Sequence, residues 1–377
     1  MDGRGFFCRR SCNLTIKKGA PRWAFRIEID PAGGASPWWV SILAVLLALI
    51  LSGFLIQLNG TDALRVYAKM FQGAFGSVFG LTETLVKTIP LLLCGLGVAI
   101  AYRISVWNIG AEGQFIAGAV GATGVMIYFP QLGPWESLPL MLLAGILSGG
   151  LWGLLTALPK VWFGVNELIT SLMLNYIAFL GLQFLVFGPW RDPKGFNFPG
   201  TPVFPAAETI PTLGGTRLHW GFFVALAVVF LYAVLVKSTR WGYELRLIGA
   251  NPKAARSAGI QIRGHVILVM FLSGALAGLA GMMEVSGVTH RLNESVSPGY
   301  GYTAIIVAWI AKLNPWGLVV SAFFLAGLIE GGFNVQTLGL PPSISSMIQG
   351  AVLFFLIAGD LVGRLRLRRK NTQEQGA

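Results

Sequence analysis

The feature that most constrains this chain is a series of long apolar runs that contain no charged residue. The clearest one, Trp38 to Leu58, has no Asp, Glu, Lys or Arg. A helix of about 20 apolar residues is long enough to cross the ~30 Å hydrocarbon core of a bilayer. Of the whole chain, 54% is hydrophobic and 12% charged, whereas soluble domains contain about a quarter charged residues. The sequence therefore predicts an integral membrane protein.

Ten apolar segments, separated by polar or Pro/Gly-rich breaks, are candidates for membrane spans. They are residues 38–58, 83–103, 108–129, 139–158, 166–187, 218–237, 265–286, 300–311, 316–333 and 344–362. We expect an all-α polytopic fold with about ten transmembrane helices, in a range of eight to eleven. Segment 300–311 is short and segment 108–129 begins with a polar, Gly-rich turn, so either could be a broken or re-entrant helix.

The basic residues gather in three places and define the expected domain organisation. The chain carries 28 Lys and Arg against 16 Asp and Glu, a net charge of +12. Clusters lie in a leader (1–37), in a central loop (238–263) and in a tail (364–377), on either side of or within a transmembrane domain at 38–363. With both termini in the cytoplasm, all three clusters lie inside, as the positive-inside rule requires. No basic stripe on a soluble face is predicted, so nucleic acid is not an expected partner.

Three further features complete the organisation. Cys8, Cys12 and Cys94 have no disulfide or metal-site spacing, and the role of the Cys8/Cys12 leader stays open. The Pro-rich segment 188–217 is predicted to be an extended, turn-rich extracytoplasmic loop that could form part of a docking surface. Segment 60–80 is either a plain connector or an amphipathic helix at the outer interface, with Val66, Met70 and Phe71 on its apolar side.

Small residues recur at every fourth position in two of the predicted spans. The sets are Gly145, Gly149 and Gly153 in one span and Gly274, Ala277, Gly278 and Gly281 in the other. Small side chains let helices approach closely in lipid. The pattern predicts tight helix packing and carries no information about a transported molecule.

The central loop contains the most specific motif, in the sequence from Arg240 to Ile260. Asn251 and Pro252 provide a cap and a first-position proline, and Gly259 provides a stop, so residues 253–258 are predicted to form one or two helical turns. A short helix exposed on the inner surface needs a partner. An ordinary basic loop is the alternative interpretation.

The spacing Ala254-Ala255-x-x-x-Gly259 resembles the cytoplasmic coupling loop of ABC importer permeases, which contacts the ATPase subunit. Asn108-Ile-Gly-Ala-Glu-Gly-Gln114 and the segment 299–311 are similar to the nucleoside and simple-sugar branch of that family, and the resemblance covers about residues 83–359. Lys253 stands where many of those loops have Glu. The resemblance implies an ATPase-coupling loop made of Asn251, Pro252, Lys253, Ala254, Ala255, Arg256 and Gly259.

The resemblance also implies the partners. These are a separate ATPase that holds ATP and Mg, a second permease subunit that is paralogous or identical, and an extracytoplasmic substrate-binding lipoprotein. The expected substrate is a nucleoside or a simple sugar, and the expected location is the bacterial inner membrane. The sequence has no Gly-x-x-x-x-Gly-Lys-[Ser/Thr] loop, so no ATPase activity and no cofactor are expected in this chain. An ion-coupled secondary transporter and a structural assembly factor are the alternatives.

Polar residues in or beside the spans are candidates for the substrate pathway, because lipid disfavours them. The candidates are Asn108, Glu112, Gln114, Asn166, Glu167, Asn175, Thr303 and Trp309. Glu112 could bond ribose hydroxyls or pair with Arg103. Likewise, Glu284, Glu330, Asn334 and Gln349 could belong to the pathway or simply bind a neighbouring helix. Other tryptophans, Trp38, Trp39, Trp152, Trp162, Trp241 and Trp316, are interpreted as belt residues at the membrane interface.

Overall fold

The computed structural model describes residues 25–29, 38–58, 60–195, 198–341, 343–363 and 365–369. Cys8, Cys12 and most of the basic leader and tail lie outside these residues. Two short strands that the sequence analysis did not expect, β1 (Phe25–Ile29) and β2 (Leu365–Arg369), form an antiparallel pair. Phe25 lies opposite Arg369, so the segment before α1 pairs with the segment after α13.

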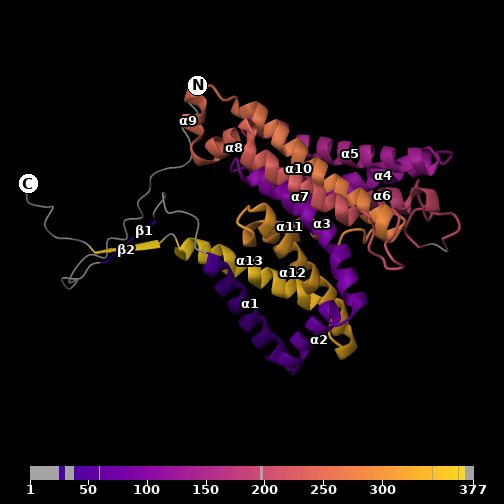
Figure 1. The fold of residues 1–377 in the computed structure, drawn as a ribbon, viewed down its shortest axis with the longest axis horizontal. Helices are drawn as coiled ribbons and strands as arrows, with labels where there is room; N and C mark the ends of the chain where they lie inside the picture. Colours follow the sequence, from indigo (N-terminus) through magenta and orange to yellow (C-terminus); the bar gives the residue numbers. More distant parts are fainter. Residues whose placement is uncertain are drawn as a thin grey trace, which may run out of the picture.

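The rest of the regular structure in the described residues is helical (Figure 1). The helices are α1 (Trp38–Leu58), α2 (Ala63–Phe75), α3 (Val78–Tyr102), α4 (Ala111–Tyr128), α5 (Pro134–Phe163), α6 (Glu167–Phe187), α7 (Gly221–Ser238), α8 (Arg240–Ala250), α9 (Pro252–Ser257), α10 (Ile262–Glu284), α11 (Tyr300–Ile310), α12 (Pro315–Asn334) and α13 (Ser343–Gly363). Three shorter turns are η1 (Ala206–Glu208), the π-helical η2 (Val285–Thr289) and η3 (Val335–Leu338).

Each of the ten predicted segments coincides with a helix, but not all of these helices can cross a membrane by themselves. Seven of those described, α1, α3, α5, α6, α7, α10 and α12, are long and apolar enough to do so. Helix α11 has only 11 residues, a rise of roughly 16 Å, which is about half of the hydrocarbon core. Helix α4 begins with Glu112 and Gln114 in its first turns, which lowers its mean hydropathy. The structure therefore confirms a helical multi-pass fold with seven candidate spans among the described residues, while the count of about ten spans and the cytoplasmic termini stay predictions.

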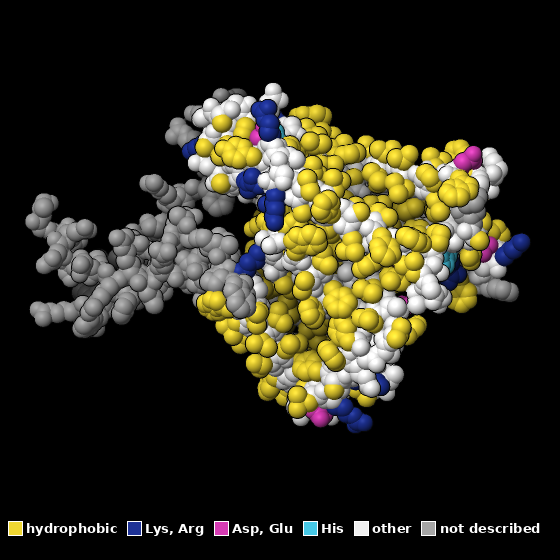
Figure 2. All heavy atoms as spheres, in the orientation of Figure 1, with side chains coloured by type: hydrophobic (Ala, Val, Ile, Leu, Met, Phe, Trp, Pro, Cys, Tyr) yellow, Lys and Arg dark blue, Asp and Glu magenta, His cyan; other side chains and the backbone are white. Residues whose placement is uncertain are grey.

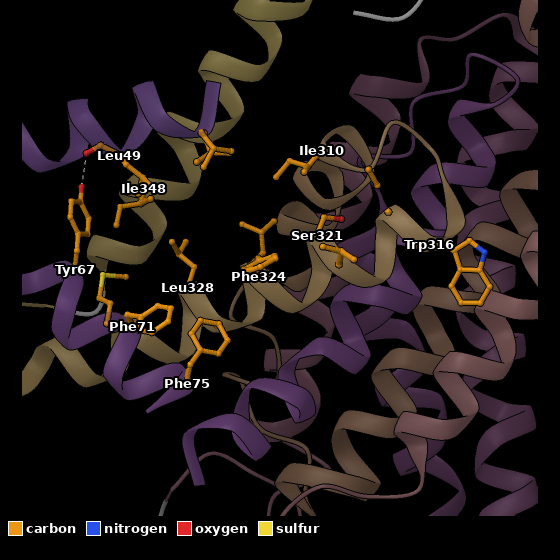
Figure 3. A pocket seen from close by; sticks show the side chains of 18 of the residues that line it. Leu49, Tyr67, Phe71, Phe75, Ile310, Trp316, Ser321, Phe324, Leu328 and Ile348 are labelled. Carbon is orange, nitrogen blue, oxygen red and sulfur yellow. Dashed lines mark hydrogen bonds between the residues drawn. The ribbon is translucent and has the colours of Figure 1, made fainter. Parts of the chain in front are cut away.

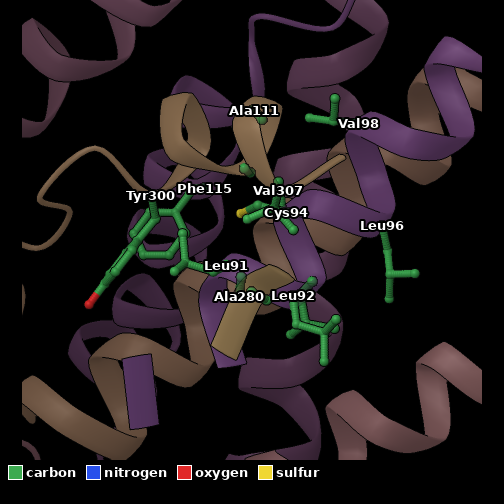
Figure 4. Packing of buried hydrophobic residues seen from close by; sticks show 14 of the residues in the cluster. Leu91, Leu92, Cys94, Leu96, Val98, Ala111, Phe115, Ala280, Tyr300 and Val307 are labelled. Carbon is green, nitrogen blue, oxygen red and sulfur yellow. The ribbon is translucent and has the colours of Figure 1, made fainter. Parts of the chain in front are cut away.

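Helix α3 is the centre of the bundle. Buried side chains along it, including Leu91, Leu92, Cys94 and Leu96, pack against residues of α4, α10 and α11 (Figure 4). In its most apolar window 89% of the residues are buried, against 28% for α5 and α6. The outer surface of the bundle carries apolar side chains across its middle, with Lys and Arg toward its ends (Figure 2). Lipid can solvate that apolar band as well as the protein interior does.

Helices α5 and α10 approach each other through their glycines, as the small-residue pattern predicts. A Cβ added at Gly149 would lie 2.4 Å from the Gly274 carbonyl oxygen, and one added at Gly278 would lie 2.2 Å from that of Gly145. Real Cβ atoms do not come so close to other atoms. The helix backbones are therefore in contact, and only glycine fits at these crossing points.

Residues 188–217 and 60–80 were the two segments predicted to lie outside the spans, and both can be compared with the structure. Within residues 188–195 and 198–217, the regular structure is the three-residue η1 and the start of an isolated bridge from Thr212 to His219, so the described part of the segment is turn-rich as expected. The amphipathic helix is confirmed, because α2 buries Val66 and Met70; Phe71 is 66% exposed and lines an apolar cavity described below.

Candidate functional site

Polar side chains from four helices and one connecting segment meet at the start of α4. We call this group the α4 node; its members are Asn108, Glu112, Gln114, Asn175, Ser273 and Tyr302. Five of the six are buried, whereas Tyr302 is 41% exposed. Four of them, Asn108, Glu112, Gln114 and Asn175, were predicted from the sequence, and the structure brings these four together.

Asn108 and Gln114 satisfy each other's amide groups. Asn108 Nδ2 donates to Gln114 Oε1 at 2.8 Å, and Gln114 Nε2 donates to Asn108 Oδ1 at 3.1 Å. Asn108 Nδ2 also donates to Ser273 Oγ at 2.7 Å, and that hydroxyl donates to the Gly97 carbonyl at 2.6 Å. The pair thus joins the entry to α4 to helices α10 and α3. The amide groups of Asn108 and Gln114 therefore hold the start of α4 in place relative to α10 and α3.

Asn175 connects α6 to both of its polar neighbours. Its Oδ1 accepts from the Gly113 amide at 2.9 Å, which satisfies one of the free N–H groups in the first turn of α4. Its Nδ2 donates to the Ile109 carbonyl at 2.9 Å and to the Tyr302 hydroxyl at 3.2 Å. One side chain therefore fixes α6, the start of α4 and the start of α11 relative to one another.

Glu112 holds the start of the short helix α11. Its Oε2 accepts from the Gly301 amide at 2.7 Å, where a carboxylate suits the positive end of the helix dipole. Arg103 does not pair with it, so that alternative was wrong. Arg103 Nε instead donates to the Tyr232 hydroxyl at 2.9 Å, and its Nη2 donates to the Leu313 carbonyl at 2.7 Å.

The other four predicted pathway residues lie outside the α4 node. Asn166 caps α6 by accepting from the Leu168 amide at 2.9 Å, and Glu167 pairs with Lys160 at 2.6 Å. Thr303 donates to Gln349 Oε1 at 2.8 Å, which joins α11 to α13. Trp309 stacks on Trp107 with 5.6 Å between the ring centroids. Each has a local structural partner that the sequence did not reveal.

A cavity of 570 Å³ lies between α4, α5 and α6, beside the α4 node. It is lined mainly by apolar side chains, together with Ser148 and the indole of Trp152. The Trp152 Nε1–H group is buried and has no hydrogen-bond partner among the described residues. A Cβ added at Gly113 would lie 3.1 Å from that nitrogen, so the indole edge reaches the node. Trp152 lies within α5 and packs partly against the core, and its interpretation as an interfacial belt residue stays a prediction.

Sequence reasoning thus missed Trp152 and Ser273 as members of this region. Both lie next to a glycine of the α5–α10 contact in the sequence, but on other faces of their helices: Trp152 lines the cavity between α4, α5 and α6, and Ser273 bonds Gly97 of α3.

A second cavity, of 900 Å³, opens between α1, α2, α12 and α13 (Figure 3). Leu49, Phe71, Phe324 and Leu328 point into it, and nearly all of its lining is apolar. The Tyr67 hydroxyl at its edge already donates to the Leu49 carbonyl at 2.6 Å. A groove of this composition suits hydrocarbon and offers little to a polar solute.

At one end of the bundle, α8 and α9 form a two-helix unit that we call the α8–α9 unit (Figure 1). Asn251 caps α9 by accepting from the amides of Lys253 and Ala254, and Gly259 follows it with a φ of +79°. The predicted cap, short helix and glycine stop are confirmed. Within α9 only Ala255 is buried, so most of the helix surface faces outward.

Helix α8, which the sequence analysis had treated as loop, seats this unit on the bundle. A Cβ added at Gly249 would lie 2.0 Å from the Arg103 carbonyl oxygen, and Arg246 donates to the Val236 carbonyl. Glu244 pairs with His265 in the first turn of α10 at 2.9 Å. The unit therefore contacts the ends of three helices of the bundle directly: α3, α7 and α10.

Comparisons with known proteins agree with this architecture. Residues 80–357 match the protein family described as branched-chain amino acid transport system / permease component. The glucose ABC transporter permease protein TsgB13 of Haloferax volcanii is 34% identical over 356 residues, which cover 90% of this chain and 93% of the relative. The guanosine ABC transporter permease protein NupP of Bacillus subtilis is 31% identical, with 88% and 97% covered. The nucleoside ABC transporter permease protein NupB of Lactococcus lactis is 27% identical, with 84% and 90% covered.

Proposed function

This chain belongs to the branched-chain amino acid transport system permease component family, and from that premise we propose that it forms the import pathway for a nucleoside or a simple sugar. The support for this substrate class is its likeness to a glucose, a guanosine and a nucleoside permease protein over most of the chain. All three substrates contain a hydroxyl-bearing sugar ring or are one. The shared ring is the chemistry that a common pathway would have to accommodate.

The proposed coupling to an ATPase rests on the position of the α8–α9 unit. An exposed, well-capped helix is seated by α8 on the ends of α3, α7 and α10. A separate ATPase that binds α9 and closes on ATP and Mg would move these three helix ends together. Asn251, Pro252, Lys253, Ala254, Arg256 and Gly259 are exposed and would supply the contact surface, while Ala255 packs inward. This chain contributes the pathway, and the partner hydrolyses ATP.

The opposite end of the bundle suits a delivery protein. Segment 188–217 is attached to the segment that follows α10 through backbone hydrogen bonds from Thr201 to Leu292 (2.9 Å), from Phe204 to His290 (2.8 Å) and from Ile210 to Ser286 (3.0 Å). A segment fastened in this way offers a fixed surface to an extracytoplasmic binding lipoprotein. A paralogous second permease, or a second copy of this chain, would complete the pathway in the bacterial inner membrane, with both termini in the cytoplasm.

Within the chain, the cavity beside the α4 node is the part of the path best suited to a sugar ring. The indole of Trp152 offers an apolar face to the ring carbons, and the hydroxyl of Ser148 on the cavity wall can donate to a ring hydroxyl. Asn175 and Tyr302 stand next to the indole and hold α6 and α11 in place. Two of the three helices around the cavity, α4 and α6, are tied together by the α4 node, so movement of the node would reshape the cavity.

Uptake by reconstituted transporters tests this proposal. The chain is co-purified with its co-expressed ATPase and binding protein, placed in liposomes with internal ATP, and offered labelled guanosine, uridine, glucose and ribose. Gly259→Val forces a β-branched residue into the left-handed region, whereas Gly264→Val adds the same side chain in open space on α10. We expect ATP-dependent uptake that Gly259→Val abolishes and Gly264→Val retains. Uptake that ignores ATP and follows an ion gradient would contradict the proposal.

A further inference from the structure

Five charged residues gather near the end of the bundle opposite the α8–α9 unit. We call them the outer charge cluster: Glu83 and Lys87 on α3, Arg217 before α7, Glu284 at the end of α10 and Glu330 on α12. The three glutamates are 5%, 6% and 8% exposed. Charged groups in such positions are costly in a membrane protein unless they are paired.

Two ion pairs account for four of the five residues. Lys87 Nζ contacts Glu330 Oε2, and Arg217 Nη1 contacts Glu83 Oε2 at 3.1 Å. Glu284 interacts electrostatically with Lys87, Arg217 and Glu83, yet it forms no ion pair with any described residue. Three carboxyl groups therefore share two cations. If every group were ionised, the cluster would carry one uncompensated negative charge.

The neighbouring groups do not supply the missing positive charge. Lys69 lines the same polar cavity as Glu330, but it forms no ion pair with a described acid and is not among the charged neighbours of Glu284. His219 packs against Gly287, one turn beyond Glu284, but burial and then the charge of His290 lower the pKa of His219 to about 4. Its imidazole is neutral at pH 7. His290 interacts with His219 and bonds the Ser286 carbonyl, and the remaining titratable neighbour, Tyr300 on α11, is an acid.

A second observation comes from Glu83. Its Oε1 is buried and accepts no hydrogen bond from any described residue. Glu284, for its part, stands where α10 gives way to the π-helical η2, and π-helical segments often mark functional sites. The cluster thus contains a carboxyl group without a cation and a carboxylate oxygen without a donor.

We propose that the outer charge cluster binds one proton, held by the carboxyl group of Glu284. The proton removes the uncompensated charge and turns Glu284 into a hydrogen-bond donor, which Glu83 Oε1 lacks, either directly or through one water molecule. A metal cation fits less well. It requires several oxygen ligands at once, whereas a proton needs a single oxygen.

The structure also offers a route for exchange of this proton with water. A polar cavity of 250 Å³ lies between α2, α3 and α12, and Glu330, Asn334, Gln72, Ser77 and Lys69 are among its lining residues. Its volume holds several water molecules. Water there reaches Glu330, which shares Lys87 with Glu284, so the protonation of the cluster can follow the pH on that side of the membrane.

Infrared spectroscopy of the purified full chain in lipid nanodiscs tests the assignment. A protonated carboxyl group in an apolar site has a carbonyl band of its own that shifts in heavy water. We expect this band at neutral pH and expect Glu284→Gln to remove it. Glu330→Gln should also remove it although Glu284 is intact, because two acids then balance two cations. Glu136→Gln, an exposed residue at the start of α5, is the control and should leave it unchanged.

The balance of charges predicts the result for each variant, so single measurements can contradict the proposal. The proposal is overturned if wild type shows no such band, if the band survives Glu284→Gln, or if it survives Glu330→Gln. Loss of the band on addition of Na⁺ at constant pH would mean that a metal cation takes the place of the proton. This result would equally overturn the assignment. None of these readouts involves uptake, so they are independent of the proposed transport function.

Discussion

At the level of single residues, the polar groups in this bundle differ in how many elements they join. Asn166 and Asn175 lie on the same helix and were both predicted as pathway residues, but Asn166 caps its own helix, whereas Asn175 bonds α4, α11 and the segment before α4. Loss of a cap exposes one amide that water can reach. Loss of a buried connector leaves several polar groups unsatisfied, which is more costly.

Alanine substitution of these two asparagines should separate the roles. Asn175→Ala leaves the Gly113 amide and the Ile109 carbonyl without their partner, at a cost of about 3 kcal/mol in the free energy of unfolding. Asn166→Ala should cost about 1 kcal/mol, the usual value for an N-cap. Thermal unfolding in detergent measures both. Equal losses would contradict the distinction.

His219 should make stability depend on pH. Because burial lowers its pKa from 6.5 to about 4, the folded chain keeps the imidazole neutral while the unfolded chain takes up a proton below pH 6.5. The stabilisation is complete above pH 6.5 and falls as the pH drops toward 4, by up to about 3 kcal/mol.

The substitution His219→Asn isolates this contribution. Asparagine can keep an acceptor for the Gly221 amide, which His219 Nδ1 provides at 3.1 Å, but it does not titrate. We expect the thermal midpoint of the variant to decline less between pH 6.5 and 4 than that of the wild type. Parallel declines would show that another group dominates.

At the level of elements, glycine contacts decide how the helices of this bundle fit together. Gly278→Ala should lower the free energy of unfolding by about 2 kcal/mol or more, because the new methyl group meets the backbone of α5. Gly350→Ala on α13 meets no atom within 4 Å and should be neutral or slightly stabilising. Thermal unfolding of the two variants, each against wild type, gives the comparison. A stable Gly278→Ala variant would show that the helices can separate without cost.

The contact of α8 with α3 should be needed to transmit movement. Gly249→Ala pushes α8 away from the Arg103 carbonyl while leaving α9 intact, so the ATPase should still bind and hydrolyse ATP. We expect uptake in proteoliposomes to fall at least tenfold with hydrolysis retained. Gly264→Ala, in open space nearby, is the matched control. Parallel loss of uptake and hydrolysis would mean that the substitution damages the ATPase contact itself.

At the level of the whole molecule, the α8–α9 unit and the connection between α4 and α5 lie at opposite ends (Figure 1). If the α8–α9 end is cytoplasmic, a cysteine placed at Lys253 should react with a membrane-impermeant thiol reagent only in inverted vesicles. A cysteine placed at Glu136 should react only from outside the cell. Both residues are exposed and Cys94 is buried, and Cys8 and Cys12 are replaced by serine so that the introduced cysteine is the thiol that reacts. The reverse pattern would invert the topology.

Much of this organisation could be predicted from the sequence. Hydropathy located every long helix, since lipid demands apolar residues wherever a helix faces it, and Asn251, Pro252 and Gly259 located α9. Helix α8 was missed because its mean hydropathy is low and its buried residues, Leu245 and Ile248, form only a narrow stripe. The partners of polar residues could not be predicted either. Glu112 bonds Gly301 across 189 positions, and no local pattern encodes such a contact.

The enclosed position of α3 has a consequence for the order of synthesis. Glu83 and Lys87 enter the membrane early, while their partners Arg217 and Glu330 follow 134 and 243 residues later. Until then both charges lie in the membrane without their final partners. Their spacing of one helical turn, with the acid first, places both on one face of α3, where they can neutralise each other. Glu83 and Lys87 can thus pair with each other in the nascent helix, and form their final ion pairs when Arg217 and Glu330 enter the membrane with α7 and α12.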